Sequence, residues 1–149
     1  MQAVEIKKTL DARRRPNLDG LRILVVDDEA DARDLLAIRI RQCGADVITA
    51  SSAEAAMEAL AQEGPRPDLI LSDIAMPGED GYSLMRRVRA LSPEQGGRIP
   101  AIAVTAYSRT EDRMQAMAAG FQLHVPKPVN VSELAHAITS IIGRFNHHQ

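Results

Sequence analysis

Several apolar runs in this sequence are followed by polar side chains of the types that bind metal ions and phosphoryl groups. Asp27 and Asp28 follow one run, Asp73 ends another, and Thr105 and Lys127 lie at the ends of two more. If the carboxylates converge they repel one another, since two like charges ~4 Å apart cost roughly 4 kcal/mol at an effective dielectric near 20. Such a cluster is expected around a hard divalent cation, and Mg²⁺ suits a site of few carboxylates and waters.

The same residues suit phosphoryl chemistry. Aspartate is a recognised covalent acceptor of phosphoryl groups, so Asp73 is a candidate acceptor. Lys127 would supply a fixed positive charge and Thr105 a hydroxyl donor, and phosphoryl transfer asks a protein mainly for such positioning and charge neutralisation. The alternative is that Asp73 only caps the turn before the next helix.

These residues need strands that deliver them to one place. The run Leu69–Leu71 before Asp73 is typical of a strand buried on both faces, and open α/β sheets place their chemistry at the carboxyl ends of such strands. Five strands alternating with five helices predict right-handed crossovers and a parallel sheet, in an open three-layer α/β sandwich. The expected strands cover residues 21–26, 46–50, 69–73, 99–105 and 122–125.

Capping patterns predict where the helices begin and end. Capping boxes place a Ser or Thr three residues before a Glu or Gln, and Asn130 with Glu133 resembles one although Asn is not the usual first residue. A glycine in the C′ position is typical of a helix end. The third helix is expected over 81–91. Helices are expected to begin at the pairs Ser51 with Glu54, Ser108 with Glu111, and Asn130 with Glu133. The first, fourth and last helices are expected to end at Gly44, Gly120 and Gly143.

Length and composition exclude several classes of protein. The chain has 149 residues, 45% of them hydrophobic, and a formal net charge of −2, which argues against direct nucleic-acid binding by bulk electrostatics. A single cysteine, Cys43, cannot form an internal disulfide. No apolar run is long enough to span a membrane, and the N-terminus lacks the apolar region of a signal peptide. We therefore expect a cytoplasmic protein.

The charged N-terminal stretch differs from the rest of the chain. Residues 1–20 carry Lys7, Lys8 and Arg13–Arg15, and are read either as a solvated lead-in or as a linker from an upstream domain. One domain is expected over 21–144, followed by a short tail over 145–149.

With these residues in place, the sequence resembles the receiver domain of two-component response regulators and hybrid histidine kinases. The resemblance is carried by Asp27-Asp28, Asp73 with Met76-Pro77-Gly78 behind it, Thr105-Ala106 and Lys127-Pro128, and it covers about residues 21–143. It implies the flavodoxin-like (βα)5 fold with strand order 2-1-3-4-5. In that order the first, third, fourth and fifth strands are neighbours.

The resemblance also implies roles for individual residues. Asp73 would be the phospho-acceptor, and Asp28 and Asp73 would hold Mg²⁺ together with the backbone carbonyl of Ala75. Asp27 would act mainly through a bound water. Thr105 would be the switch hydroxyl, Lys127 would pair with the phosphoryl group, and the Lys127–Pro128 peptide bond would be cis.

His124 is a candidate for a role in switching, and Tyr107 is a candidate for a role in the lifetime of the phosphoryl group. His124 occupies the position three residues before Lys127, where the family often has Tyr or Phe. It is either a ring that swings inward on activation or a strand histidine with no switching role. Tyr107, with small Ala75, would screen attacking water, or else is a surface tyrosine with no kinetic effect.

The resemblance implies partners as well. A phosphohistidine on a sensor histidine kinase or a histidine phosphotransfer protein would donate to Asp73, and the domain would catalyse its own phosphorylation and dephosphorylation. A downstream protein partner would bind the face formed by the fourth helix, the fifth strand and the last helix, and a homodimer is open. The receiver of a hybrid kinase is favoured, with a stand-alone single-domain regulator or a non-phosphorylated binding module as alternatives.

Two other hypotheses, a phosphatase and a nucleotide-binding protein, fit the sequence less well than a receiver domain does. A haloacid-dehalogenase-like phosphatase has a second Asp two residues after its nucleophile, where this chain has Ala75. A nucleotide-binding loop after the first strand would be Gly-rich, whereas 28–31 is acidic and would repel phosphate.

Overall fold

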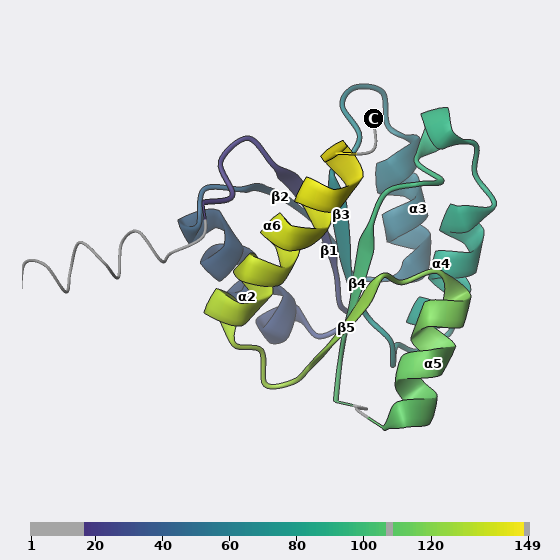
Figure 1. Ribbon diagram of the computed structural model, residues 1–149. Helices are drawn as coiled ribbons and strands as arrows, with labels where there is room; N and C mark the ends of the chain where they lie inside the picture. The colour runs from purple at the N-terminus through teal and green to yellow at the C-terminus, as the bar shows by residue number, and fades with distance from the viewer. Residues whose placement is uncertain (1–16, 107–108, 148–149) are drawn as a thin grey trace, which may run out of the picture.

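A five-stranded parallel sheet with the order β2-β1-β3-β4-β5 forms the centre of the molecule (Figure 1). The computed structural model describes residues 17–106 and 109–147. This order confirms the expected flavodoxin-like (βα)5 fold. The strands are β1 (Arg22–Val26), β2 (Asp46–Ala50), β3 (Leu69–Asp73), β4 (Ala101–Thr105) and β5 (Leu123–Pro126).

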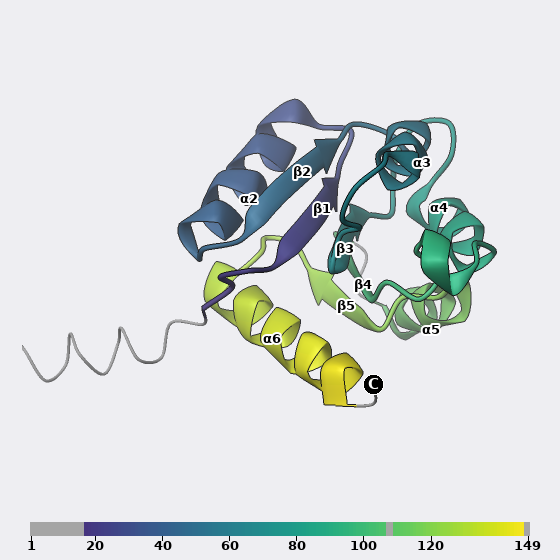
Figure 2. The ribbon, with the colours of Figure 1, turned by 90° about the horizontal axis from the view of Figure 1, so that it is seen from above.

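Helices cover both faces of the sheet, with α2 and α6 on one face and α3, α4 and α5 on the other (Figure 2). Every residue of the central strands β3 and β4 is buried, because side chains from each strand point into both layers. The helices are α2 (Ala30–Gln42), α3 (Ala53–Ala61), α4 (Gly81–Arg89), α5 (Thr110–Ala119) and α6 (Val131–His147), with a 3₁₀ turn, η1 (Pro93–Gln95).

Alternation along the strands divides the apolar residues into two cores. In β1, Leu24 and Val26 belong to the core under α3, α4 and α5, and Ile23 and Val25 belong to the core under α2 and α6. Leu18 is also fully buried in the second core, and its backbone N–H donates to the carbonyl of Cys43 at 2.9 Å. From the sequence, Leu18 was expected in the charged stretch of residues 1–20 that precedes the domain, so its burial in the core was not predicted.

The register of the strands aligns their carboxyl ends. Val26 pairs with Ser72, Asp73 with Val104, and Thr105 with Pro126. The residues that end these strands or directly follow them therefore lie at one edge of the sheet, which we call the carboxyl edge.

Some helix boundaries match the expectation and others differ. Gly44, with φ +104°, follows the end of α2 as a C′ glycine, and the Asn130 side chain accepts a hydrogen bond from Glu133 N at 3.0 Å. The cap of α3 was expected at Ser51, and this is wrong. Ser52 has the extended backbone of an N-cap and accepts from Ala55 N at 3.0 Å.

Two further boundaries were expected at Ser108 and Gly143. Ser108 lies outside the described residues. Gly143 does not stop α6, which continues to His147. A glycine inside a helix costs only about 1 kcal/mol, and neither Pro nor another Gly follows it to end the helix.

At the opposite edge of the sheet, which we call the amino edge, Arg89 at the end of α4 bonds to two loops, the one before β4 and the one before β5. Its guanidinium donates to the carbonyl of Gly120 at 3.0 and 2.8 Å and to that of Gly97 at 3.0 Å. It also donates to Gln122 Oε1 at 3.3 Å, and that oxygen accepts from Ala101 N at 2.7 Å. The end of α4 is thus fastened to the starts of β4 and β5.

Of the helices within residues 17–106 and 109–147, none has the length and apolar character needed to cross a bilayer.

Candidate functional site

Three carboxylates converge at the carboxyl edge, as the ends of β1 and β3 require. Asp27, Asp28 and Asp73 each offer an oxygen, and these oxygens lie within 4.8 Å of one another. Asp27 and Asp73 are buried, with 5% and 8% of their surface exposed, whereas Asp28 is more open to solvent. The donor set is all oxygen and carries three negative charges, which fits a hard divalent cation such as Mg²⁺.

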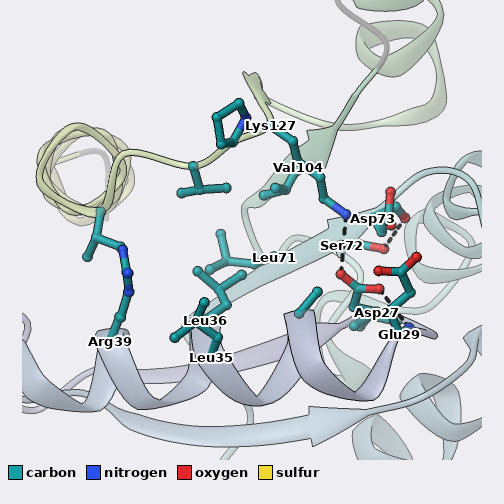
Figure 3. Close-up of a pocket in the computed structure, with 15 residues that line it drawn as sticks. Asp27, Glu29, Leu35, Leu36, Arg39, Leu71, Ser72, Asp73, Val104 and Lys127 are labelled. Atoms are coloured by element: carbon teal, nitrogen blue, oxygen red, sulfur yellow. Dashed lines mark hydrogen bonds and ion pairs between the residues drawn. The ribbon is translucent and has the colours of Figure 1, made fainter.

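Lys127, which directly follows β5, brings a positive charge to the two buried carboxylates. Its Nζ lies 3.0 Å from Asp73 Oδ2 and 3.4 Å from Asp27 Oδ2 (Figure 3). Burial on its own would lower the pKa of Lys127, but the hydrogen bond and charge of Asp73, together with Asp27, outweigh it. The pKa of Lys127 is therefore raised above its ordinary value, and the lysine stays charged beside the carboxylates.

Backbone amides fix the orientation of the buried carboxylates. Asp73 Oδ1 accepts from Ile74 N at 2.7 Å, and Asp27 Oδ1 accepts from Glu29 N at 2.9 Å. Each carboxylate thus uses one oxygen for the backbone while the other, Oδ2, faces Lys127. The Ser72 hydroxyl donates to the Asp73 carbonyl at 2.8 Å, which holds the end of β3.

The loop after Asp73 returns closely onto the strand. Gly81 N donates to Ile74 O at 2.8 Å, and a Cβ at Gly81 would overlap the carbonyl oxygen of Asp73. Only glycine fits there, so α4 begins in direct contact with the backbone of Asp73. Asp80 caps this helix by accepting from Ser83 N at 2.8 Å.

The expected switch residues lie at several places around this site. Thr105 is buried at the end of β4, with 1% of its surface exposed, and its carbonyl accepts from Lys127 N at 2.9 Å. Ala75 is exposed two residues after Asp73. His124 is half-buried in β5, where it pairs with Ala103, and Tyr107 lies outside the described residues.

The peptide bond between Lys127 and Pro128 is cis, as the resemblance implied.

A pocket beside the carboxylates was not foreseen from the sequence. It has a volume of about 340 Å³ and lies between α2 and the segment that follows Lys127. Glu29 and Ser72 line it together with Asp27 and Asp73. The only sequence signal for the pocket was that Glu29 directly follows Asp27-Asp28. Its apolar walls could not be predicted, because they come from segments far apart in the chain.

A family model described as the response regulator receiver domain matches residues 23–139 of the chain. Among curated proteins, an "uncharacterized 14.6 kDa protein in sodA1 3′ region" of Leptolyngbya boryana is 46% identical over 116 residues, which are 78% of this chain and 86% of that protein. Hybrid signal transduction histidine kinase D of Dictyostelium discoideum is 37% identical over 133 residues. These cover 87% of this chain but only 9% of the kinase.

Among solved structures, a receiver domain protein from Methanospirillum hungatei superimposes with a TM-score of 0.76 at 26% identity. The match covers 87% of this chain and 98% of that one. The similarity therefore extends over the whole sheet and its helices.

Proposed function

The chain belongs to the response regulator receiver domain family, and from this premise we propose that Asp73 accepts a phosphoryl group in a two-component phosphorelay. The observation that carries the proposal is the contact between Asp73 and Lys127, at 3.0 Å, inside the group of three carboxylates. A carboxylate held beside a fixed ammonium and two further acids has the neighbours that a phosphorylated aspartate needs.

The transfer step follows from the positions of these groups. A carboxylate oxygen of Asp73 attacks the phosphorus of a phosphohistidine, and the bond from phosphorus to the histidine nitrogen breaks as the new phosphorus–oxygen bond forms. The imidazole nitrogen leaves with the electron pair. Lys127 offsets the negative charge of the phosphoryl oxygens, and the backbone N–H of Ile74 holds the Asp73 carboxylate in place.

We propose Mg²⁺ as the cation that the acidic group holds. Asp28, Asp73 and the carbonyl of Ala75 would be its protein ligands, with Asp27 acting mainly through a water. When bound, Mg²⁺ supplies positive charge that neutralises both the carboxylates and the incoming phosphoryl oxygens.

Phosphorylation would be read out through Thr105 and the face formed by α5, β5 and α6. A new phosphoryl group at Asp73 attracts the Thr105 hydroxyl, and the movement biases a two-state arrangement of that face. His124 lies on β5 within it and would be the ring that follows Thr105. Met114 and Met117 of α5 are 67% and 54% exposed, so apolar surface is available to a downstream protein or a second copy.

The lifetime of the phosphoryl group would depend on Tyr107 and Ala75, the residues proposed to screen attacking water. We expect Tyr107→Ala to shorten the lifetime of the phosphorylated protein, measured by the decay of the label after the donor is removed. An unchanged lifetime would remove this role.

The phosphoryl donor would be a sensor histidine kinase or a histidine phosphotransfer protein in the cytoplasm. We propose that the chain acts as the receiver of a hybrid kinase, which the similarity to hybrid kinase D supports. A stand-alone regulator is the second candidate, supported by the 14.6 kDa relative, 86% of which the chain covers.

The test is labelling of the purified chain with acetyl phosphate and Mg²⁺, read on a phosphate-affinity gel. We expect one labelled site, stable in acid and labile in base, that disappears in Asp73→Asn and when Mg²⁺ is chelated. Asp34→Asn, which removes an exposed carboxylate from α2, is the matched control and should label like the wild type. Labelling that survives in Asp73→Asn, or wild-type protein that takes no label, would overturn the proposal.

A further inference from the structure

The pocket beside Asp73 has the size and the walls of a small-molecule site. Its volume of about 340 Å³ lies within the range of about 300–1,000 Å³ that is usual for ligand pockets. Most of its walls are apolar, and they come from both of the helices on this face of the sheet and from the three strands β1, β3 and β4. The apolar wall residues include Leu35, Leu36, Leu71, Val104, Val129 and Val131.

The rim of the pocket leaves apolar surface in contact with water. Leu35 is 52% exposed, and Leu36 lies next to it on α2. Both side chains face the gap between α2 and the segment after Lys127 (Figure 3). A bound apolar group would remove this surface from water, which is the main favourable term in ligand binding.

The two ends of the pocket carry opposite charge. Asp27 and Asp73 lie at one end and Arg39 at the other, with Leu36, Leu71 and Val104 placed between them (Figure 3). While no divalent cation is bound at the carboxylates, an anionic group would be repelled at that end and attracted at the Arg39 end. The charges thus define how a polar–apolar molecule would be oriented.

Arg39 is available for such a contact. It is exposed on α2, and within residues 17–106 and 109–147 its side chain makes neither a hydrogen bond nor an ion pair. The residues three and four positions away on either side are Leu35, Leu36, Gln42 and Cys43, so none is acidic. By contrast, Lys127 is already paired with Asp73 and Asp27.

We infer that this pocket binds a compact amphipathic anion, a molecule with an apolar or aromatic body and one carboxylate or sulfonate group. The body lies against Leu36, Leu71 and Val104, and the anionic group pairs with Arg39. A molecule bound in this way occupies the space beside Asp73 and hinders the approach of a phosphoryl donor, a consequence that rests on the proposed function.

The test uses 8-anilinonaphthalene-1-sulfonate, which has an aromatic body and one sulfonate, as the probe for the full chain. We expect saturable binding with one probe per chain, followed by fluorescence, and amide shifts in NMR spectra at residues 35–39 and 129–131. Arg39→Gln should weaken binding at least fivefold, and Leu35→Gln, at an exposed position, should weaken it severalfold. Arg86→Gln, which removes an exposed arginine from the opposite face of the sheet, is the control and should bind like the wild type.

A neutral probe separates the charge from the apolar contact. N-phenyl-1-naphthylamine has the same rings without the sulfonate, so its affinity should not change in Arg39→Gln. Equal binding of the anilinonaphthalene sulfonate by Arg39→Gln and wild type, or amide shifts confined to another surface such as Met114 and Met117, would overturn the inference.

A second measurement keeps the pocket and the phosphorylation apart. We expect a saturating concentration of the sulfonate probe to slow acetyl phosphate labelling of the wild type several-fold more than that of Arg39→Gln. Normal labelling without any probe binding would refute the pocket and leave the proposed function standing. Probe binding at residues 35–39 without labelling under any condition would support the pocket and refute the proposed function.

Discussion

The two edges of the sheet handle partly buried charge in opposite ways. At the carboxyl edge three carboxylates lie together, and the Lys127 ammonium pairs with two of them, Asp27 and Asp73. At the amino edge a single cation, Arg89, is surrounded by neutral oxygen atoms that all accept its hydrogen bonds: the carbonyls of Gly97 and Gly120 and the side-chain oxygen of Gln122.

Because of this difference, the carboxyl edge is suited to binding a cation, whereas the amino edge is suited to holding α4, β4 and β5 together. An excess of negative charge at the carboxyl edge is unfavourable until a cation arrives, so the resting protein gives up stability there in favour of binding. Arg89 donates four hydrogen bonds within the chain, and burial lowers its pKa from the ordinary value. The amino edge can therefore hold α4, β4 and β5 while the other edge changes its occupants.

The largest effect is expected from Arg89→Met. The substitution leaves the carbonyls of Gly97 and Gly120 without their donor, and hydrogen bonds to charged groups contribute about 1.5–3 kcal/mol, so the free energy of unfolding should fall by about 3 kcal/mol. Urea denaturation measures it. Arg86→Met, on the same helix but exposed, should change stability little. If both variants lose the same stability, the amino edge is not the anchor that we describe.

At the carboxyl edge we expect a substitution to raise the free energy of unfolding rather than lower it. Without Mg²⁺, Asp28→Asn should be more stable than the wild type by about 1 kcal/mol, because one of three like charges is removed from an open position. Mg²⁺ at 100 times its dissociation constant should stabilise the wild type by about 2.7 kcal/mol. The same concentration should stabilise Asp28→Asn much less. Thermal unfolding with and without a chelator measures both the stability difference between the two proteins and the stabilisation by Mg²⁺. If Asp28→Asn is less stable than the wild type in chelator, the three carboxylates do not destabilise the protein by repulsion.

A pair of glycine substitutions tests how closely Arg89 is packed. Gly120 and Gly64 have φ of +119° and +111°, so alanine is strained at both. A Cβ at Gly120 would lie 2.7 Å from Arg89 Cγ, whereas nothing lies within 4 Å of one at Gly64. We expect Gly120→Ala to cost about 1 kcal/mol more than Gly64→Ala in urea denaturation. Equal costs would show that Arg89 moves aside freely.

The smallest effect is expected for Glu79→Gln in the loop after Asp73. A hydrogen bond from Ser83 and the contact with Arg87, at 2.6 Å, hold the pKa of Glu79 below its ordinary value, against the opposing effect of burial. A lowered pKa in the folded state stabilises above the unfolded pKa, and the benefit is lost as pH falls through the folded value. The small stability advantage of the wild type at pH 7 should therefore vanish below about pH 4. An advantage that persists at pH 3 would contradict this.

The carboxyl edge was largely predictable because its residues end or follow apolar runs that are local in sequence. Asp73 and Thr105 each close a run, and Asp27 and Lys127 come directly after one. Parallel strands then place all of them at one edge. The order of the strands could not be worked out from the runs themselves and came from the family resemblance.

The amino edge was not predictable, because its contacts join residues distant in sequence. Arg89 reaches Gly120 and Gln122, which lie 31 and 33 positions away. The helical periodicity of residues 81–91 indicates only that Arg89 lies largely off the apolar face of its helix, and it names no partner for the side chain. The apolar pocket was not predicted for the same reason, since its walls come from α2, three strands and the start of α6.

The prediction of the N-cap of α3 was wrong for a local reason. Ser51 and Ser52 are both suitable cap residues, and the spacing to Glu54 favours Ser51. Which serine has the extended backbone depends on where β2 ends, at Ala50, and on which turn then leads into the helix. Spacing alone does not contain that information.

Helix α4 touches both edges at once, through Gly81 beside the backbone of Asp73 and through Arg89 at its other end. Nine helical residues span about 13 Å, so the length of the helix fixes the distance between the backbone at Asp73 and the loops that precede β4 and β5. An inserted or deleted residue inside it would rotate Arg89 by about 100° around the axis and pull it from its acceptors. Variation in chain length should therefore be tolerated at Gly64, where nothing lies within 4 Å of an added Cβ, but not between Gly81 and Arg89.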